Sequence, residues 1–420
     1  MRTKAIILTT LSILLSCKLM AQGLLDTTRT QFMMLETYGT AYQQGYDHGA
    51  QKYREIAASL ERYRFEYIEY LLQSAGTDLK YKDFKNFLIH KTDMFQKLEE
   101  ESPEQYALMK GIANGAYLDF EDIFCYNLNY DETLWIVEAL TSKDLSLQQA
   151  EGHCSHASFW NGQQNKIVYS FDWARWLDGT QLVWKMHFNN GLEVLNFTYA
   201  GIIAGQGVNN YGVGFTAHST MELQRATTNA TPSIMNYSKI LLSKSKEEAR
   251  NMLMKTHQAA PVAYTLFDRK GTEVLECGPF PTQHVEAPNQ MLVQTNHSHK
   301  NKAFSAPFLQ MVDAPENINR KVFEEKYQQK AILRATSFAD SHQREKALLA
   351  IFSKEDVRQS PEVLKEKWKS TPAFKPFHKD NFYNNFCTIT EIGKEKVKVW
   401  ATPGEFDRFA LDFFELTLIR

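Results

Sequence analysis

The sequence predicts an α+β protein in which antiparallel sheets are covered by helices. From residue 41 to about residue 140, apolar residues recur at three- and four-residue spacing, as on one face of a helix. After residue 152, short β-rich runs separated by turn signals take over. Further helical patterns at 234–256 and 318–368 interrupt these strands. Blocks of helices and strands in this order are typical of layered antiparallel sheets, because a parallel sheet needs regular alternation.

Three stretches define the helical block. Two of them, YREIAASLERYRFEYIEYLL and EDIFCYNLNYDETLWIVEAL, have the amphipathic period of a surface helix. The third is SPEQYALMKGIANGAY. Its Ser102 occupies an expected N-cap and its Pro103 the first turn, positions that these residue types prefer. We expect an N-terminal helical segment.

Nine runs have the composition of strands, and turn dipeptides such as Asn161-Gly162 and Asn190-Gly191 separate several of them. The runs cover residues 154–160, 166–173, 181–188, 192–199, 262–268, 273–277, 291–297, 385–392 and 396–402. The chain of 420 residues, 43% of them hydrophobic, is long enough to fill a large core. Its 47 basic and 49 acidic residues nearly balance, so the charge predicts no nucleic-acid partner.

The first 21 residues are typical of an export signal. Arg2 and Lys4 precede an apolar run, and Ala21 stands at a possible cleavage point. The mature protein would then be periplasmic or extracellular. A lipoprotein box ending at Cys17 is the alternative, and it would leave the protein anchored to a membrane by lipid. No later run has the roughly 18 apolar residues of a membrane span.

Cys154 opens a predicted hairpin. Its first strand begins at this cysteine, and the returning strand ends in Asp172-Trp173. Because antiparallel strands joined by a short loop bring their far ends together, we expect Asp172 near Cys154. Cys154 has two other interpretations: a small buried core residue, or a partner in a disulfide.

Five segments follow one another in the order of a known family. They are GTAYQQGYDHG, LMKGIANGAYLDFEDIFCYNLNYDE, the segment from Cys154 to Asp172-Trp173, AGQGVNNYGVGF and VQTNHS. Together, from about Gly39 to His297, they resemble the acyl-coenzyme A:aminopenicillanate (isopenicillin N) acyltransferase-like family of N-terminal-nucleophile (Ntn) hydrolases. Phospholipase B-like proteins are more distantly similar. The resemblance implies an αββα sandwich with an N-terminal helical segment.

The resemblance also implies self-processing. The precursor would cleave itself between His153 and Cys154. A helical α-chain, residues 22–153, and a β-chain, residues 154–420, would stay associated as one Ntn-hydrolase domain. The new α-amino group of Cys154 would be the general base for its own thiol, and the thiolate would form a thioester with the substrate.

The other site residues come from the same resemblance. Asp172 would hold the α-amino group, and Asn296 would donate to the oxyanion. A basic residue is expected after the Thr-Asn-His segment, and Arg344 is a candidate. The chain departs from the family pattern in having Tyr169-Ser170 in place of Arg-Asn before Asp172. It also has His153 in place of a small or acidic residue.

Four further residues are candidates for the pocket: Trp173, Asn209, His218 and His297. Asn209 can equally be a structural turn residue. The glycines of GQGVNNYGVG are expected to serve backbone geometry. No metal-ligand spacing accompanies the histidines, so neither a metal nor another cofactor is predicted.

The predicted function is that of a self-cleaving cysteine hydrolase or acyltransferase, acting on an amide bond in a small acylated substrate. Two alternatives stay open. One is a phospholipase B-like lipid acyl hydrolase, and the other is a catalytically inactive exported protein that binds an acyl ligand. The sequence leaves water and an amine equally open as the acceptor.

Overall fold

The computed structural model describes residues 31–143, 154–173, 175–220, 222–225, 230–287, 289–304, 330–352, 359–376 and 383–419. The export signal, Cys17 and His153 lie outside these ranges. Export, lipid anchoring at Cys17 and cleavage after His153 therefore stay predictions.

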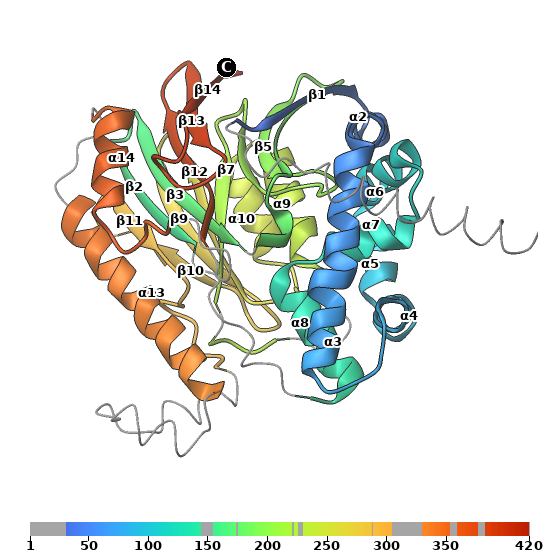
Figure 1. The fold of residues 1–420 in the computed structure, drawn as a ribbon. Helices are drawn as coiled ribbons and strands as arrows, with labels where there is room; N and C mark the ends of the chain where they lie inside the picture. The colour runs from blue at the N-terminus through green and yellow to red at the C-terminus, as the bar shows by residue number, and fades with distance from the viewer. Residues whose placement is uncertain are drawn as a thin grey trace, which may run out of the picture.

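Two facing sheets form the centre of the molecule (Figure 1). The larger sheet contains, in spatial order, β1 (Met33–Gly39), β4 (Gln181–Phe188), β5 (Glu193–Tyr199), β6 (Gln206–Asn209), β7 (Gly214–Ser219), β8 (Val262–Asp268), β9 (Gly271–Cys277) and β10 (Gln283–Glu286). The smaller sheet contains β11 (Met291–Gln294), β2 (Ser155–Trp160), β3 (Asn165–Trp173), β12 (Tyr383–Ile392), β13 (Lys396–Thr402) and β14 (Asp412–Thr417). All neighbouring strands are antiparallel except β1 and β4.

Helices cover both outer faces. The outer face of the smaller sheet packs against α13 (Lys330–Phe352) and α14 (Pro361–Lys369), and their Phe352 and Trp368 share a core cluster with Phe159 and Val168. The larger sheet contacts α9 (Ser233–Leu242) and α10 (Lys246–Leu253). This order of layers is the αββα sandwich predicted above, and the α+β class is confirmed.

An N-terminal helical region packs beside the larger sheet (Figure 1). It comprises α2 (Ala41–Arg62), the π-helical η1 (Tyr63–Ile68), α3 (Glu69–Ser74), α4 (Tyr81–Lys91), α5 (Met94–Glu101), α6 (Pro103–Ala116), α7 (Phe120–Tyr126) and α8 (Tyr130–Thr141). A short 3₁₀ turn, η2 (Arg175–Leu177), follows β3. Among the helices of the described ranges, none combines the length and the apolar character that a membrane crossing requires.

Strand β1 was not predicted. It precedes the helices and pairs in parallel with β4, and the Trp184 indole donates a 2.7 Å hydrogen bond to the Thr37 hydroxyl across the pair. The segment before the cysteine is therefore not only helical, since it adds a strand to the larger sheet. β6, β7, β10 and β14 were also missed. β6 and β10 have only four residues each, and β6 and β7 adjoin the glycine-rich stretch.

Helices α2 and α6 touch through their backbones. A Cβ added to Gly49 would lie 2.2 Å from the Ile112 carbonyl oxygen, and one added to Gly115 would lie 2.1 Å from that of Tyr46. Gly45 approaches Leu108 in the same way. The two GxxxG stretches therefore run side by side in the same direction, where only glycine leaves room for the neighbouring backbone. This contact explains why both segments carry paired glycines.

We predict that Gly115→Ala lowers the free energy of unfolding by about 1 to 3 kcal/mol, because the methyl group would force the helices apart. Urea unfolding measures this change. The matched control is Gln51→Ala on the exposed side of α2, which should change stability by less than about 0.5 kcal/mol. An unchanged midpoint for Gly115→Ala would show that the helices can separate at no cost.

Candidate active site

Three strand ends meet at Cys154. It directly precedes β2, whose Ser155 pairs with Ser170 of β3, so that Asp172 lies two residues beyond this pair. On the other side, Gln294 of β11 pairs with His156. Continuing that register by two residues brings Asn296 opposite Cys154. The hairpin thus brings Asp172 near Cys154, and the third strand brings Asn296.

The Cys154 side chain is a buried free thiol, with 6% of its surface exposed. Burial raises its pKa to about 12, and the nearby Asp172 carboxylate adds to the increase. The Tyr169 hydroxyl, the Asp172 backbone and the Arg344 guanidinium oppose it only in part. In the continuous chain this thiol is therefore protonated at neutral pH and needs a base before it can attack a carbonyl.

All four cysteines within the described ranges are unpaired thiols. They are Cys125, Cys154, Cys277 and Cys387. The disulfide interpretation of Cys154 is therefore wrong for this structure.

Asp172 is completely buried. One oxygen, Oδ1, accepts a 2.5 Å hydrogen bond from the Asn384 amide. The other oxygen, Oδ2, has no hydrogen-bond partner among the described residues. Burial raises the pKa of Asp172 to about 7, although Lys375, Arg344 and Asn384 act to lower it. This carboxyl therefore titrates near neutral pH.

Arg344 of α13 joins the parts of the site. Its guanidinium is fully buried and donates from Nη1 to the Cys154 carbonyl oxygen at 2.9 Å and to the Ser155 hydroxyl at 2.7 Å. Nη2 donates to Asn296 Oδ1 at 3.0 Å, and Nε to Asp340 Oδ2 at 2.7 Å. The guanidinium thus lies next to Cys154 and the first residue of β2.

Asn296 is held at both ends of its side-chain amide. Its Oδ1 accepts from Arg344, and its Nδ2 donates to the Ser219 carbonyl oxygen at 3.1 Å. A Ser341 hydroxyl accepts a 2.8 Å bond from its backbone N–H. Because an amide nitrogen carries two hydrogens, Asn296 Nδ2 keeps one donor beyond its bond to Ser219.

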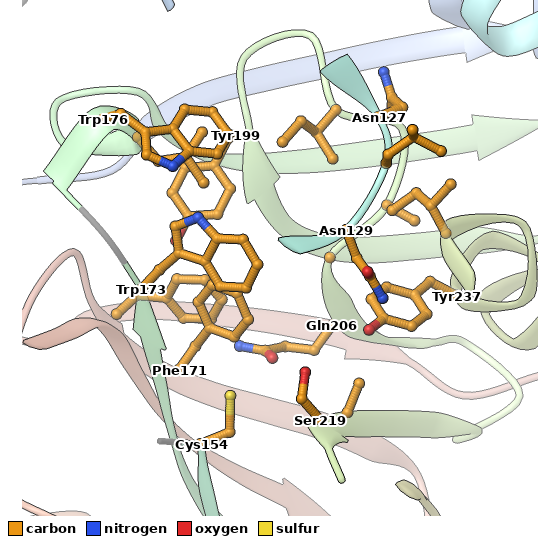
Figure 2. A pocket seen from close by; sticks show the side chains of 18 residues that line it. Asn127, Asn129, Cys154, Phe171, Trp173, Trp176, Tyr199, Gln206, Ser219 and Tyr237 are labelled. Carbon is orange, nitrogen blue, oxygen red and sulfur yellow. The ribbon is translucent and has the colours of Figure 1, made fainter. Parts of the chain in front are cut away.

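A mainly apolar pocket opens above the Cys154 sulfur (Figure 2). The space inside it is about 750 Å³, including the part that is open to solvent. Its aromatic walls are Phe171, Trp173, Trp176, Tyr199, Tyr237 and Phe386. The polar lining residues are Asn127, Asn129, Gln206 and Ser219. A pocket of this composition suits an apolar group with one polar end.

The pocket draws on both segments of the chain. Asn127, Leu128 and Asn129 come from the helical region. The other lining residues are Cys154 and later residues, from strands of both sheets, η2, α9 and the loop between β5 and β6. The amide nitrogen of Gln206 is buried without a hydrogen-bond partner among the described residues. Sequence reasoning did not single out Gln206, because its strand β6 was not predicted.

Of the four residues predicted to line the pocket, the structure places only Trp173 there. Trp173 lines the pocket. Asn209 does not: its Nδ2 donates to the carbonyl oxygens of Leu241 and Ser243, and its Oδ1 accepts two backbone N–H groups, so its role is that of a structural turn residue. His218 lies buried between the sheets, where burial and the neighbouring His156 hold its pKa well below its usual value. His297 faces α13, not the pocket.

Buried acids should make stability depend on pH. Burial raises the pKa of Asp172, Glu132 and Glu222 to about 7, from 3.8 for the aspartate and 4.5 for the glutamates. The folded state therefore holds more protons than the unfolded state between these values. Its free energy of unfolding falls as the pH rises through that window, by at most about 1.4 kcal/mol per pH unit and group.

We predict that Asp172→Asn flattens this fall. The measurement is urea unfolding between roughly pH 4 and pH 7, in a Cys154→Ala background so that the α-amino group of residue 154 is not a variable. The exposed Asp93→Asn variant is the control and should keep the original slope. Equal slopes with and without Asp172 would mean that this carboxyl is already ionised at low pH in the folded state.

Comparison with known proteins gives a family match. Residues 182–389 match the sequence model of the acyl-coenzyme A:6-aminopenicillanic acid acyl-transferase family. The matched stretch contains Asn296 and Arg344, and it begins after Cys154 and Asp172. A search of the curated proteins finds no match.

Two solved structures are similar at low identity. An N-acylethanolamine-hydrolyzing acid amidase ortholog of Caenorhabditis elegans aligns with 56% of this chain and 92% of its own, at 13% identity and a TM-score of 0.30. Penicillin V acylase of Agrobacterium tumefaciens aligns with 63% of this chain and 86% of its own, at 11% identity and a TM-score of 0.34. The resemblance predicted from the order of the motifs is confirmed by the sequence match, because residues 182–389 carry the pattern of the acyl-transferase family.

Proposed function

We propose that this protein is a self-processing cysteine amidohydrolase or acyltransferase that cleaves an amide bond in a small substrate with an apolar acyl group. One observation carries the proposal: the Cys154 thiol lies at an apolar pocket, with the Asn296 amide and the Arg344 guanidinium at the same strand end. This grouping supplies a nucleophile, a hydrogen-bond donor and a positive charge for an acyl-transfer reaction.

Processing before Cys154 would supply the missing base. An α-amino group titrates near ~7.7 to 8.0, so at neutral pH it can take the thiol proton that a pKa of about 12 otherwise retains. His218 is a poor alternative, since burial holds its pKa well below its usual value. The self-activated cysteine is therefore the simplest source of a thiolate.

After processing, the new α-amino group would become a partner for Asp172 Oδ2, which lacks one among the described residues. An α-ammonium group beside a buried carboxylate favours the ionised form of both groups. A carboxyl with a pKa of about 7 in the continuous chain would thus become a carboxylate that orients the amine. This sequence of events links processing to activity.

The chemical steps follow from these roles. The thiolate attacks the acyl carbonyl, and the charge on the oxyanion is stabilised by the free N–H of Asn296, with Arg344 holding the amide in place. The C–N bond breaks, the amine leaves with the proton from the α-ammonium group, and a thioester remains on Cys154. Water or an acceptor amine then attacks the thioester and restores the thiol.

Contacts between the two segments support their association after cleavage. The Asn127 amide donates to the Gly201 carbonyl oxygen at 2.9 Å, and its Oδ1 accepts from the Ile203 N–H at 2.9 Å. The Gly201 N–H donates to His48 Nε2, also at 2.9 Å. With β1 paired to β4, these buried bonds would hold the α-chain and the β-chain together.

The first test is denaturing mass spectrometry of the purified protein beside a Cys154→Ala variant. We expect two fragments that meet between His153 and Cys154 in the wild type, and one chain in the variant. Under native conditions the two fragments should elute together from a sizing column. A single chain in both proteins would contradict self-processing and favour the inactive binding protein.

The second test separates the enzyme classes. We expect release of free amine from N-acyl amino acids or acylated amines, with a thioester to Cys154 trapped by acid quench. Release of fatty acid from phospholipid alone would instead support the lipid acyl hydrolase. Binding of either substrate without turnover would support the ligand-binding alternative.

The third test addresses the oxyanion. Asn296→Ala should lower kcat by about 10² to 10³ with a smaller effect on KM, because its donor acts in the transition state. Asn296→Asp keeps the size and removes the donor, and should be no more active. A kcat unchanged by both variants would remove Asn296 from the mechanism, provided that both fold.

A further inference from the structure

A cluster of histidines and one glutamate lies beside the site without entering the pocket. The sequence separates it into two short motifs, His297-Ser298-His299 after β11 and His342 to Glu345, three residues apart on α13. Residues three apart on a helix share a face. Neither pair alone has the ligand set of a metal site, which is why the sequence predicted none.

The structure brings the two motifs together. Glu345 Oε2 lies 3.1 Å from His297 Nε2 and 4.0 Å from His342 Nδ1, while Glu345 Oε1 lies 2.7 Å from His299 Nε2. The ring centroids of His297 and His342 are 3.8 Å apart. One ligand atom from each of His297, His342 and Glu345 falls within 4.8 Å of the other two.

We propose that His297, His342 and Glu345 bind a divalent transition-metal ion such as Zn²⁺. Two imidazole nitrogens and a carboxylate oxygen are ligands that zinc commonly takes, with a further position left for water or His299. Ligand atoms around a tetrahedral zinc ion stand about 3.3 Å apart, given bond lengths near ~2.0 to 2.1 Å. The half-exposed His342 can close the remaining distance by rotating its side chain.

A second set of contacts orients the ligands. His297 Nδ1 lies 2.8 Å from the Ser341 hydroxyl and 3.1 Å from that of Thr295, which leaves Nε2 directed at Glu345. Outer hydrogen bonds of this kind fix the ring and raise metal affinity. Here these bonds hold the ring of His297, which is only 2% exposed.

Two of the three ligands are open to solvent. Glu345 keeps 21% of its side-chain surface exposed, and His342 48%, so an ion can enter from solvent.

The metal would act on the active site through the backbone neighbours of its ligands. His297 follows Asn296, and Glu345 follows Arg344, and these two neighbours are themselves hydrogen-bonded. An ion between His297 and Glu345 would therefore fasten the end of β11 to α13 on the side away from the pocket. Its role is to position Asn296 and Arg344, since none of the ligands lines the pocket.

The test is zinc binding by isothermal titration calorimetry, with tag-free full-length protein that has been stripped by chelator. It is done in a Cys154→Ala background, so that neither the thiol nor processing contributes, and its outcome does not depend on the proposed catalysis. We expect one ion per chain. Cobalt in place of zinc should give the visible absorption of a tetrahedral site.

His342→Ala and Glu345→Gln should each weaken binding by at least about tenfold. The matched control is His284→Ala, which breaks a 2.8 Å contact with Glu273 in a His–Glu pair outside the cluster, and it should bind zinc like the parent. Circular dichroism checks that each variant folds. Zinc should also raise the Tm of the parent but not that of His342→Ala.

Two outcomes would overturn the proposal. One is the absence of saturable binding by the parent at micromolar zinc. The other is binding of equal strength in the parent, His342→Ala and Glu345→Gln, which would place the ion elsewhere on the chain.

Discussion

The candidate site depends on the hydrogen bonds of the buried Arg344 guanidinium. It belongs to a helix on the outer face of the smaller sheet, yet it reaches the carbonyl oxygen of Cys154 and the amide of Asn296. A buried charge costs several kcal/mol unless it is fully hydrogen-bonded. Here Asp340 supplies the counter-charge, and the strand ends supply the remaining acceptors. The same bonds that satisfy the arginine therefore hold three separate segments in one geometry.

The features that were predicted correctly from the sequence are those that local patterns determine. The hairpin from Cys154 to Asp172 was predicted because both strands and their turn lie within twenty residues and need no distant partner. All nine predicted strand runs overlap a strand of the structure. β1 was missed because β4, its partner among the described strands, follows more than a hundred residues later.

Distant contacts account for the rest of the site. Arg344 was only a candidate, since nothing near it in sequence indicates that it meets Cys154 across 190 positions. The clustering of His297 with Glu345 was likewise not predicted, because the two residues are far apart in the sequence. The hydrogen bonding and pKa of Asp172 likewise depend on Asn384, Arg344 and Lys375, which no hairpin pattern contains. Asn296 was found by its motif, but its orientation by Arg344 and Ser219 required the structure.

The mixed origin of the pocket walls has a consequence for any cleavage product. Asn127, Leu128 and Asn129 precede the expected cut, whereas Cys154 and all six aromatic wall residues follow it. Neither fragment alone contains a complete binding surface. If the chain is processed as proposed, separation of the fragments would therefore abolish binding even with Cys154 intact, and the two fragments would act together as a heterodimer encoded by a single gene.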